Sequence, residues 1–154
     1  MWLVATQNFG VARMLQERPV KEFAATTSPL SADELRLTVR HQASETNRLF
    51  FHGWGLVQIP LALLALWLAW KSGAGKFPAG AAAAMLLIVV VLAFYVVPET
   101  IRLGRLMDFV PREPPPPESA AFWRLHGAYT SLDMVKVLLA AALAFTLIRN
   151  DRDR

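Results

Sequence analysis

The stretch Phe77–Val97 (FPAGAAAAMLLIVVVLAFYVV) decides the fold of this chain, because its 21 residues include no charged side chain. At a rise of about 1.5 Å per residue, such a helix spans roughly 30 Å, the thickness of the hydrocarbon core of a bilayer. Strands of a membrane barrel alternate apolar and polar residues, and the run from Ala81 to Val97 does not. The stretch therefore predicts a membrane-spanning α-helix.

Two more stretches are long and apolar enough to span a bilayer. Leu49–Trp70 holds 22 residues without a charge, and Leu125–Ile148 is equally suitable in length although Asp133 and Lys136 interrupt it. Backbone groups in lipid must be satisfied internally, so continuous apolar runs of this length are helices. The chain is therefore predicted to be an all-α, multi-pass membrane protein.

The first 15 residues form a shorter apolar segment with Gln7 and Asn8 in its middle. This segment lacks the basic start and the small-residue cleavage site of a signal peptide. We expect it to be a first membrane helix that is short, or whose start lies upstream of Met1. With the three spans it completes a predicted four-helix bundle in a single membrane domain covering residues 1–154.

Composition supports membrane residence and excludes several classes of site. Hydrophobic residues make up 55% of the chain and charged residues 18%, against about 25% charged residues in soluble proteins. The absence of cysteine excludes disulfides, thiolate catalysis and cysteine-ligated metals. The net charge of +4 is attributed to membrane-flanking loops, and no basic patch with interleaved aromatic residues predicts nucleic-acid binding.

We expect helices at about 1–16, 31–70, 77–110 and 118–149. Ser31 and Glu34 have the spacing of a capping box, which starts the second helix. That helix is roughly 60 Å long, about twice the bilayer core, and the helical pattern also continues beyond Pro98. Helical extensions, within 31–48 and 98–117, are therefore predicted to stand beyond the bilayer on one side.

The Lys and Arg residues predict the orientation of the chain in its membrane. Ten lie on the side of the extensions and five on the opposite side. By the positive-inside rule we expect the extensions in the cytoplasm and both termini outside, in a bacterial inner membrane.

Two short motifs connect this pattern to a known family. The third span is followed by Val97-Pro98-Glu99-Thr100-Ile101-Arg102-Leu103, and the last helix begins Phe122-Trp123-Arg124-Leu125-His126-Gly127. With the spacing of the spans, these motifs resemble the bacterial four-helix membrane family called domain of unknown function 4149, which is similar to the transmembrane proteins associated with cisplatin resistance. The resemblance implies a four-helix bundle, a first span of normal length and no established activity.

Asp133 and Lys136 are candidate binding residues, because ionisable groups inside a span are costly and usually have a purpose. Their spacing of three places them on one helix face, which also carries His126. They form either an internal ion pair that neutralises itself or a proton or ion relay. His52 is a further candidate, because a metal or a haem would need His52 or His41 together with His126 from another helix.

Glu99 is the last candidate, at the start of the second extension. Glu99 and Arg102 are spaced for a pair on the helix surface, and Arg105 and Asp108 repeat the spacing. These pairs either stabilise the extension or line a charged vestibule that faces Glu45 and Arg124.

No catalytic signature is present, so we predict a non-enzymatic accessory or scaffold protein of a membrane assembly. Its expected partners are the lipid bilayer and either further copies of itself or other membrane proteins, with no cofactor and no resident metal. The alternative is a small transporter or channel component that uses Asp133, Lys136 and His126. A haem- or metal-binding membrane subunit is the third hypothesis.

Overall fold

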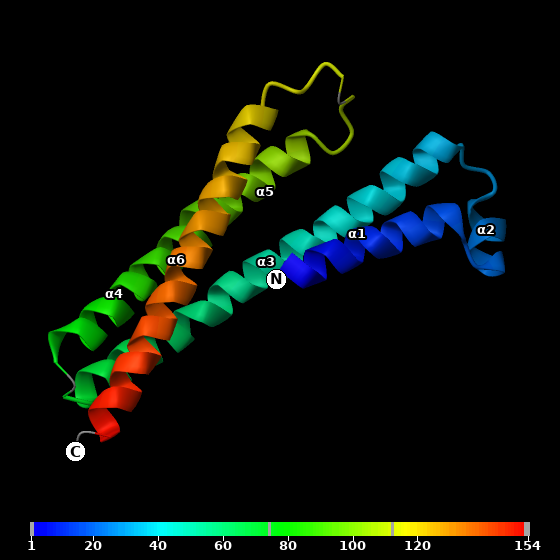
Figure 1. Cartoon of the computed structure of the whole chain (residues 1–154). Helices are drawn as coiled ribbons and strands as arrows, with labels where there is room; N and C mark the ends of the chain where they lie inside the picture. Colours follow the sequence, from blue (N-terminus) through cyan, green and yellow to red (C-terminus); the bar gives the residue numbers. More distant parts are fainter. Residues whose placement is uncertain (1, 74, 112, 153–154) are drawn as a thin grey trace.

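The computed structural model describes residues 2–73, 75–111 and 113–152, and all secondary structure in them is helical. The helices, in chain order, are α1 (Trp2–Glu17), α2 (Lys21–Thr27), α3 (Ala32–Lys71), α4 (Lys76–Val91), the π-helix η1 (Leu92–Val96), α5 (Val97–Leu106) and α6 (Ser119–Arg152). The elements α4, η1 and α5 follow one another without a break, so they form one long helix with a π-helical segment inside it (Figure 1).

Three helices are long and apolar enough to cross a membrane: α3, the continuous helix Lys76–Leu106, and α6. They pack together at one end of the molecule, where Ala69 of α3, Ala82 of α4 and Leu143 of α6 form a buried cluster. Ala82 is fully buried, and such small side chains let neighbouring helices approach closely. The predicted membrane protein with three complete spans is thus consistent with the structure.

The turn between α3 and α4 makes these two helices antiparallel neighbours. Gly73 and Gly75 in this turn have φ angles of 63° and 98°, a region that glycine enters without the steric penalty of a Cβ atom. These two glycines therefore let the chain reverse direction within a few residues.

The first helices pack in a different place from the one we expected. In Figure 1, α1 lies along the N-terminal half of α3, and the pair extends away from α4 and α6. We call α1, α2 and residues 32–48 of α3 the arm. Ala12 of α1 is buried against Val39 and Ala43 of α3, and Asn8 Nδ2 donates a hydrogen bond of 2.6 Å to Asn47 Oδ1.

A four-helix membrane bundle is accordingly not confirmed. α1 packs against the predicted extension of α3 rather than against the apolar part of α3, α4 or α6. The structure therefore does not support both termini lying opposite the extensions. α1 packs against this part of α3 because the buried Asn47 side chain has its hydrogen-bond partners on α1. Besides its bond with Asn8, it donates to the Ala5 carbonyl oxygen. A helix of 16 residues is also only about 24 Å long, less than the bilayer core. Met1 lies outside the described residues.

Most of the other helix boundaries agree with those predicted from the sequence. The capping box of α3 is confirmed, because the Ser31 side chain accepts from the Glu34 backbone N–H and the Glu34 side chain accepts from Ser31. Two boundaries differ. The expected connection after the first helix contains α2, and α5 ends at Leu106 instead of continuing to residue 110. The next residues turn back to contact α3.

Candidate functional site

The polar cluster with the most ion pairs among the described residues joins the arm to the end of α5. Arg48 of α3 makes a bidentate contact with Asp108, with Nη1 2.6 Å from Oδ2 and Nη2 2.8 Å from Oδ1. Arg48 Nη1 also donates to Glu45 Oε1 at 2.6 Å. A planar guanidinium matches a carboxylate in this way, which adds geometric specificity to the attraction. These contacts fix the segment after α5 against α3.

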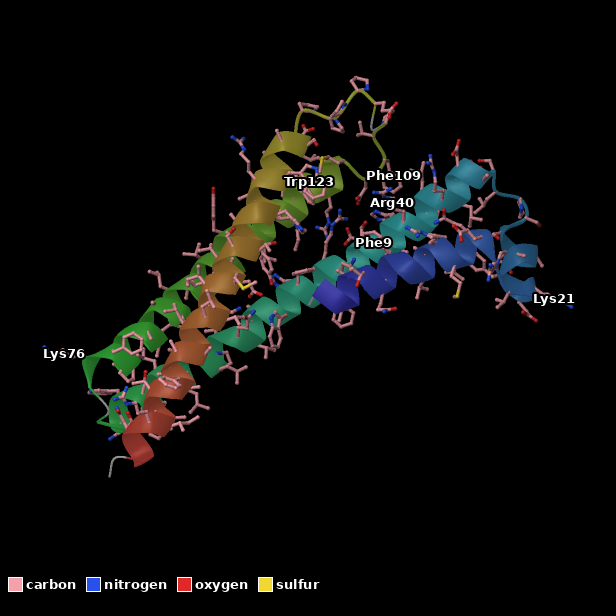
Figure 2. The ribbon with its side chains drawn as sticks, in the orientation of Figure 1. Phe9, Lys21, Arg40, Lys76, Phe109 and Trp123 are labelled. Carbon is pink, nitrogen blue, oxygen red and sulfur yellow. The ribbon has the colours of Figure 1, made fainter. Side chains whose placement is uncertain are left out.

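Two more residues complete the cluster, which we call the α3–α5 ion network (His41, Glu45, Arg48, Arg105 and Asp108). Arg105 is bidentate to Glu45, with distances of 3.0 Å from Nε to Oε1 and 2.8 Å from Nη2 to Oε2. His41 Nδ1 lies 2.9 Å from Asp108 Oδ2. The His41 ring also lies 4.8 Å from the Phe109 ring, and Figure 2 shows Phe109 reaching from the segment after α5 toward α3 beside Arg40.

Local sequence explains how these groups meet. His41, Glu45 and Arg48 are spaced by four and three residues, so one face of α3 presents all three. On the other side, Gly104 leaves room for the arginine, because a Cβ atom there would lie 3.0 Å from Arg48 Nη2. The end of α5 at Leu106 then frees Asp108 to turn toward Arg48.

The network is partly withdrawn from solvent, which strengthens its electrostatics. The side chains of Arg48 and Asp108 are only 12% and 10% exposed. The hydrogen bond from Arg105 lowers the pKa of Glu45 to about 2, with a further contribution from Arg48. Burial alone would raise the pKa of Asp108, but hydrogen bonds from Arg48 and His41 outweigh it and the pKa is lowered. Both carboxylates are therefore ionised at neutral pH.

These pKa shifts predict a loss of stability in acid. A carboxylate whose pKa is lower in the folded state stabilises the fold above its unfolded pKa, and this contribution disappears as the pH falls toward the folded pKa. With Glu45 lowered from 4.5 to about 2, we expect the unfolding free energy to fall between about pH 5 and pH 2. Unfolding in detergent micelles as a function of pH measures this. The variant Glu45→Gln/Asp108→Asn should show a flatter profile, and an equally steep one would contradict the assignment.

Three members of the network also have the donor types of a metal site. One ligand atom from each of His41, Glu45 and Asp108 lies within 4.8 Å of the others. However, Arg48 and Arg105 already occupy both carboxylates. A divalent cation would have to displace a guanidinium and overcome its charge, so this geometry favours an ion-pair network over a metal centre.

Asp133 and Lys136, predicted as neighbours on the last helix, do form an ion pair. The pair has a third member, because Lys136 Nζ also donates to Gln58 Oε1 of α3, and the polar Gln58 within an apolar span already predicts a hydrogen bond between helices. Gln58 is 8% exposed and the Lys136 side chain 13%. The pair is therefore connected to a second apolar helix, and the lysine has two oxygen acceptors.

The other predicted site residues are not brought to this group. His126 is exposed and stacks at the start of α6 against Phe122, with Trp123 edge-on to it. His52 is exposed and has no hydrogen-bonding or ring partner in the part of the chain that the structure describes. His41 contacts Asp108 instead of either histidine. The arrangement thus gives no support to a bis-histidine site.

Glu99 has the partner that the sequence predicts. Its carboxylate accepts from Arg102 Nε at 2.8 Å and from Arg102 Nη2 at 2.6 Å. The companion prediction, a pair between Arg105 and Asp108, is wrong, since both side chains cross to α3. The spacing of His41, Glu45 and Arg48 on one face of α3 was the sequence signal for the network. The residues that these three contact could not be predicted, because they depend on where α5 ends.

No family model, no curated protein and no solved structure matches this chain. The resemblance to domain of unknown function 4149 therefore stays a prediction, resting on the motifs at 97–103 and 122–127.

Proposed function

We propose that this chain is a non-enzymatic accessory or scaffold subunit of an assembly in a bacterial inner membrane. Its three apolar helices would anchor it, and the arm would contact a second copy or another membrane protein. The same proposal includes membership in the four-helix family named above. It also includes a cytoplasmic position of the arm and of residues 98–117.

The observation that carries this proposal is the apolar surface of the arm. Val11 and Met14, three residues apart on one face of α1, are 49% and 52% exposed. The arm carries charged side chains such as Asp33 and Arg36, which supports a position in water or at the membrane surface. Exposed apolar side chains grouped in such a place favour a contact with another protein.

The α3–α5 ion network supports the same role. Its arginines and carboxylates neutralise one another within the chain, so they hold the arm at a fixed position relative to α5. A fixed arm loses little conformational freedom when it binds, which favours stable assembly.

Measuring the mass of the full chain in mild detergent tests the proposal. We expect the wild-type complex to contain a second copy or another integral membrane protein in addition to the 17.1 kDa chain. Val11→Glu/Met14→Glu should dissociate that complex. Leu106→Glu/Val110→Glu is the matched control, since these side chains are similarly exposed (49% and 46%) but lie outside the arm. A wild-type chain that stays a single copy with no bound protein would overturn the proposal.

The second candidate function is a small transporter or channel component, and the contact of Lys136 with Gln58 favours it. This contact places a charged, largely buried group between two apolar helices, as ion pathways require. Asp133→Asn in proteoliposomes containing a pH-sensitive dye separates the candidates. A transporter would lose proton or ion movement that the wild type shows, whereas a scaffold would show none in either form.

A further inference from the structure

An apolar groove lies between α3 and α4 close to the turn that joins them. Its volume is about 500 Å³, and its lining consists of aliphatic and tryptophan side chains: Leu63, Leu66, Trp67, Trp70, Ala79 and Ala83. Trp67 and Trp70 are 52% and 75% exposed. Tryptophan is enriched where a membrane helix meets the headgroup layer, so the groove runs from that layer toward the hydrocarbon.

Two lysines continue the walls of this groove toward the turn. On α3 the lining residues follow a helical stripe that ends at Trp70, and Lys71 lies four residues after Trp67 on the same side. On α4, Lys76 lies three residues before Ala79. Figure 2 shows Lys76 extending from the start of α4 at the end of the molecule. Lys71 therefore directly follows the last lining residue of α3, and Lys76 lies about one turn before the first lining residue of α4.

No acidic residue lies on α3 or α4 close to these two lysines. The sequence has no Asp or Glu between Glu45 and Glu99. Lys71 and Lys76 are exposed and form no ion pair with the residues that the structure describes. An apolar groove below two free ammonium groups matches a molecule with a long apolar chain and an anionic head.

We propose that this groove binds one acyl chain of an anionic phospholipid from the surrounding leaflet, with the lipid phosphate between Lys71 and Lys76. The acyl chain would cover the leucine and tryptophan side chains, and the ammonium groups would donate to the phosphate oxygens. A free phosphate ion would leave the groove empty, so the lipid accounts for both halves of the site. The site is separate from the arm and does not depend on the scaffold role.

Native mass spectrometry of the full chain with phosphatidylglycerol or phosphatidylcholine of identical acyl chains tests the headgroup. Basic groups near a membrane surface attract anionic lipid, and two of them predict a preference on the order of tenfold for phosphatidylglycerol. Lys71→Gln/Lys76→Gln should bring the ratio of dissociation constants close to one. Arg18→Gln/Lys21→Gln removes the same charge at the arm and should keep the preference. Equal wild-type affinities, or equal losses in the two double variants, would overturn the proposal.

Bromine-labelled acyl chains test the groove itself, because bromine quenches tryptophan fluorescence at contact. In mixed vesicles, labelled phosphatidylglycerol should quench the wild type more strongly than labelled phosphatidylcholine at the same mole fraction. Trp67→Phe/Trp70→Phe should abolish that difference. If the difference persists in this variant, the lipid binds elsewhere and the proposal fails.

Discussion

Replacing Arg48 with Met is expected to lower the unfolding free energy by about 3 kcal/mol, the usual result of removing one partner from a buried ion pair. The Asp108 side chain is 10% exposed, and the remaining contact of its carboxylate would be with His41. Glu45 would keep only Arg105. Unfolding in detergent micelles with increasing SDS, followed by circular dichroism, measures the change.

Two controls make this result specific to the network. Arg102→Met breaks another bidentate pair, but the Arg102 side chain is 59% exposed, so we expect no measurable change. Arg48→Met/Asp108→Leu removes both charges and should recover much of the lost stability, because no unpaired charge stays buried. If Arg48→Met unfolds at the same SDS fraction as the wild type, the network does not stabilise the fold.

The features predicted correctly from the sequence depend on residues close together in the chain. Each of these features joins two residues three positions apart: Ser31 and Glu34 in the capping box, Glu99 and Arg102, and Asp133 and Lys136. Helix geometry alone brings such residues together once the helix is known. Long uncharged runs fix the apolar helices in the same local way.

The features that could not be predicted depend on how distant segments pack. A pair between Arg105 and Asp108 requires a helix that continues past Asp108, and α5 ends at Leu106. Asp108 then contacts Arg48, which is 60 residues earlier in the sequence. The space that Gly104 leaves for the Arg48 guanidinium is visible only when both helices are in place.

The position of α1 is a second case of the same kind. Hydrophobicity made its sequence resemble a membrane span, while its short length and its polar residues were the contrary signals. The structural role of Asn8 follows from its hydrogen bond to Asn47, which is 39 residues later in the sequence. A single buried amide needs a partner, but a sequence with many polar residues does not say which partner it has.

Replacing Asp133 with Leu is the second large effect that we expect. Lys136 would keep only Gln58 as an acceptor, and a lysine near the centre of an apolar helix costs about 3 kcal/mol when its charge is not compensated. The folded yield in membranes and the SDS fraction at half unfolding should therefore both fall. Met134→Leu is the matched control, since Met134 is 57% exposed on the same helix and carries no charge.

The double variant Asp133→Leu/Lys136→Leu separates a structural role of this pair from a functional one. It removes both charges from the span, so its stability should return to the wild-type level or exceed it. Under the scaffold proposal, the assembly measured in mild detergent should return with it, because the arm is unchanged. A double variant that folds and assembles normally but loses an ion movement present in the wild type would instead favour the transporter function, since only a conduction pathway requires charge at that depth.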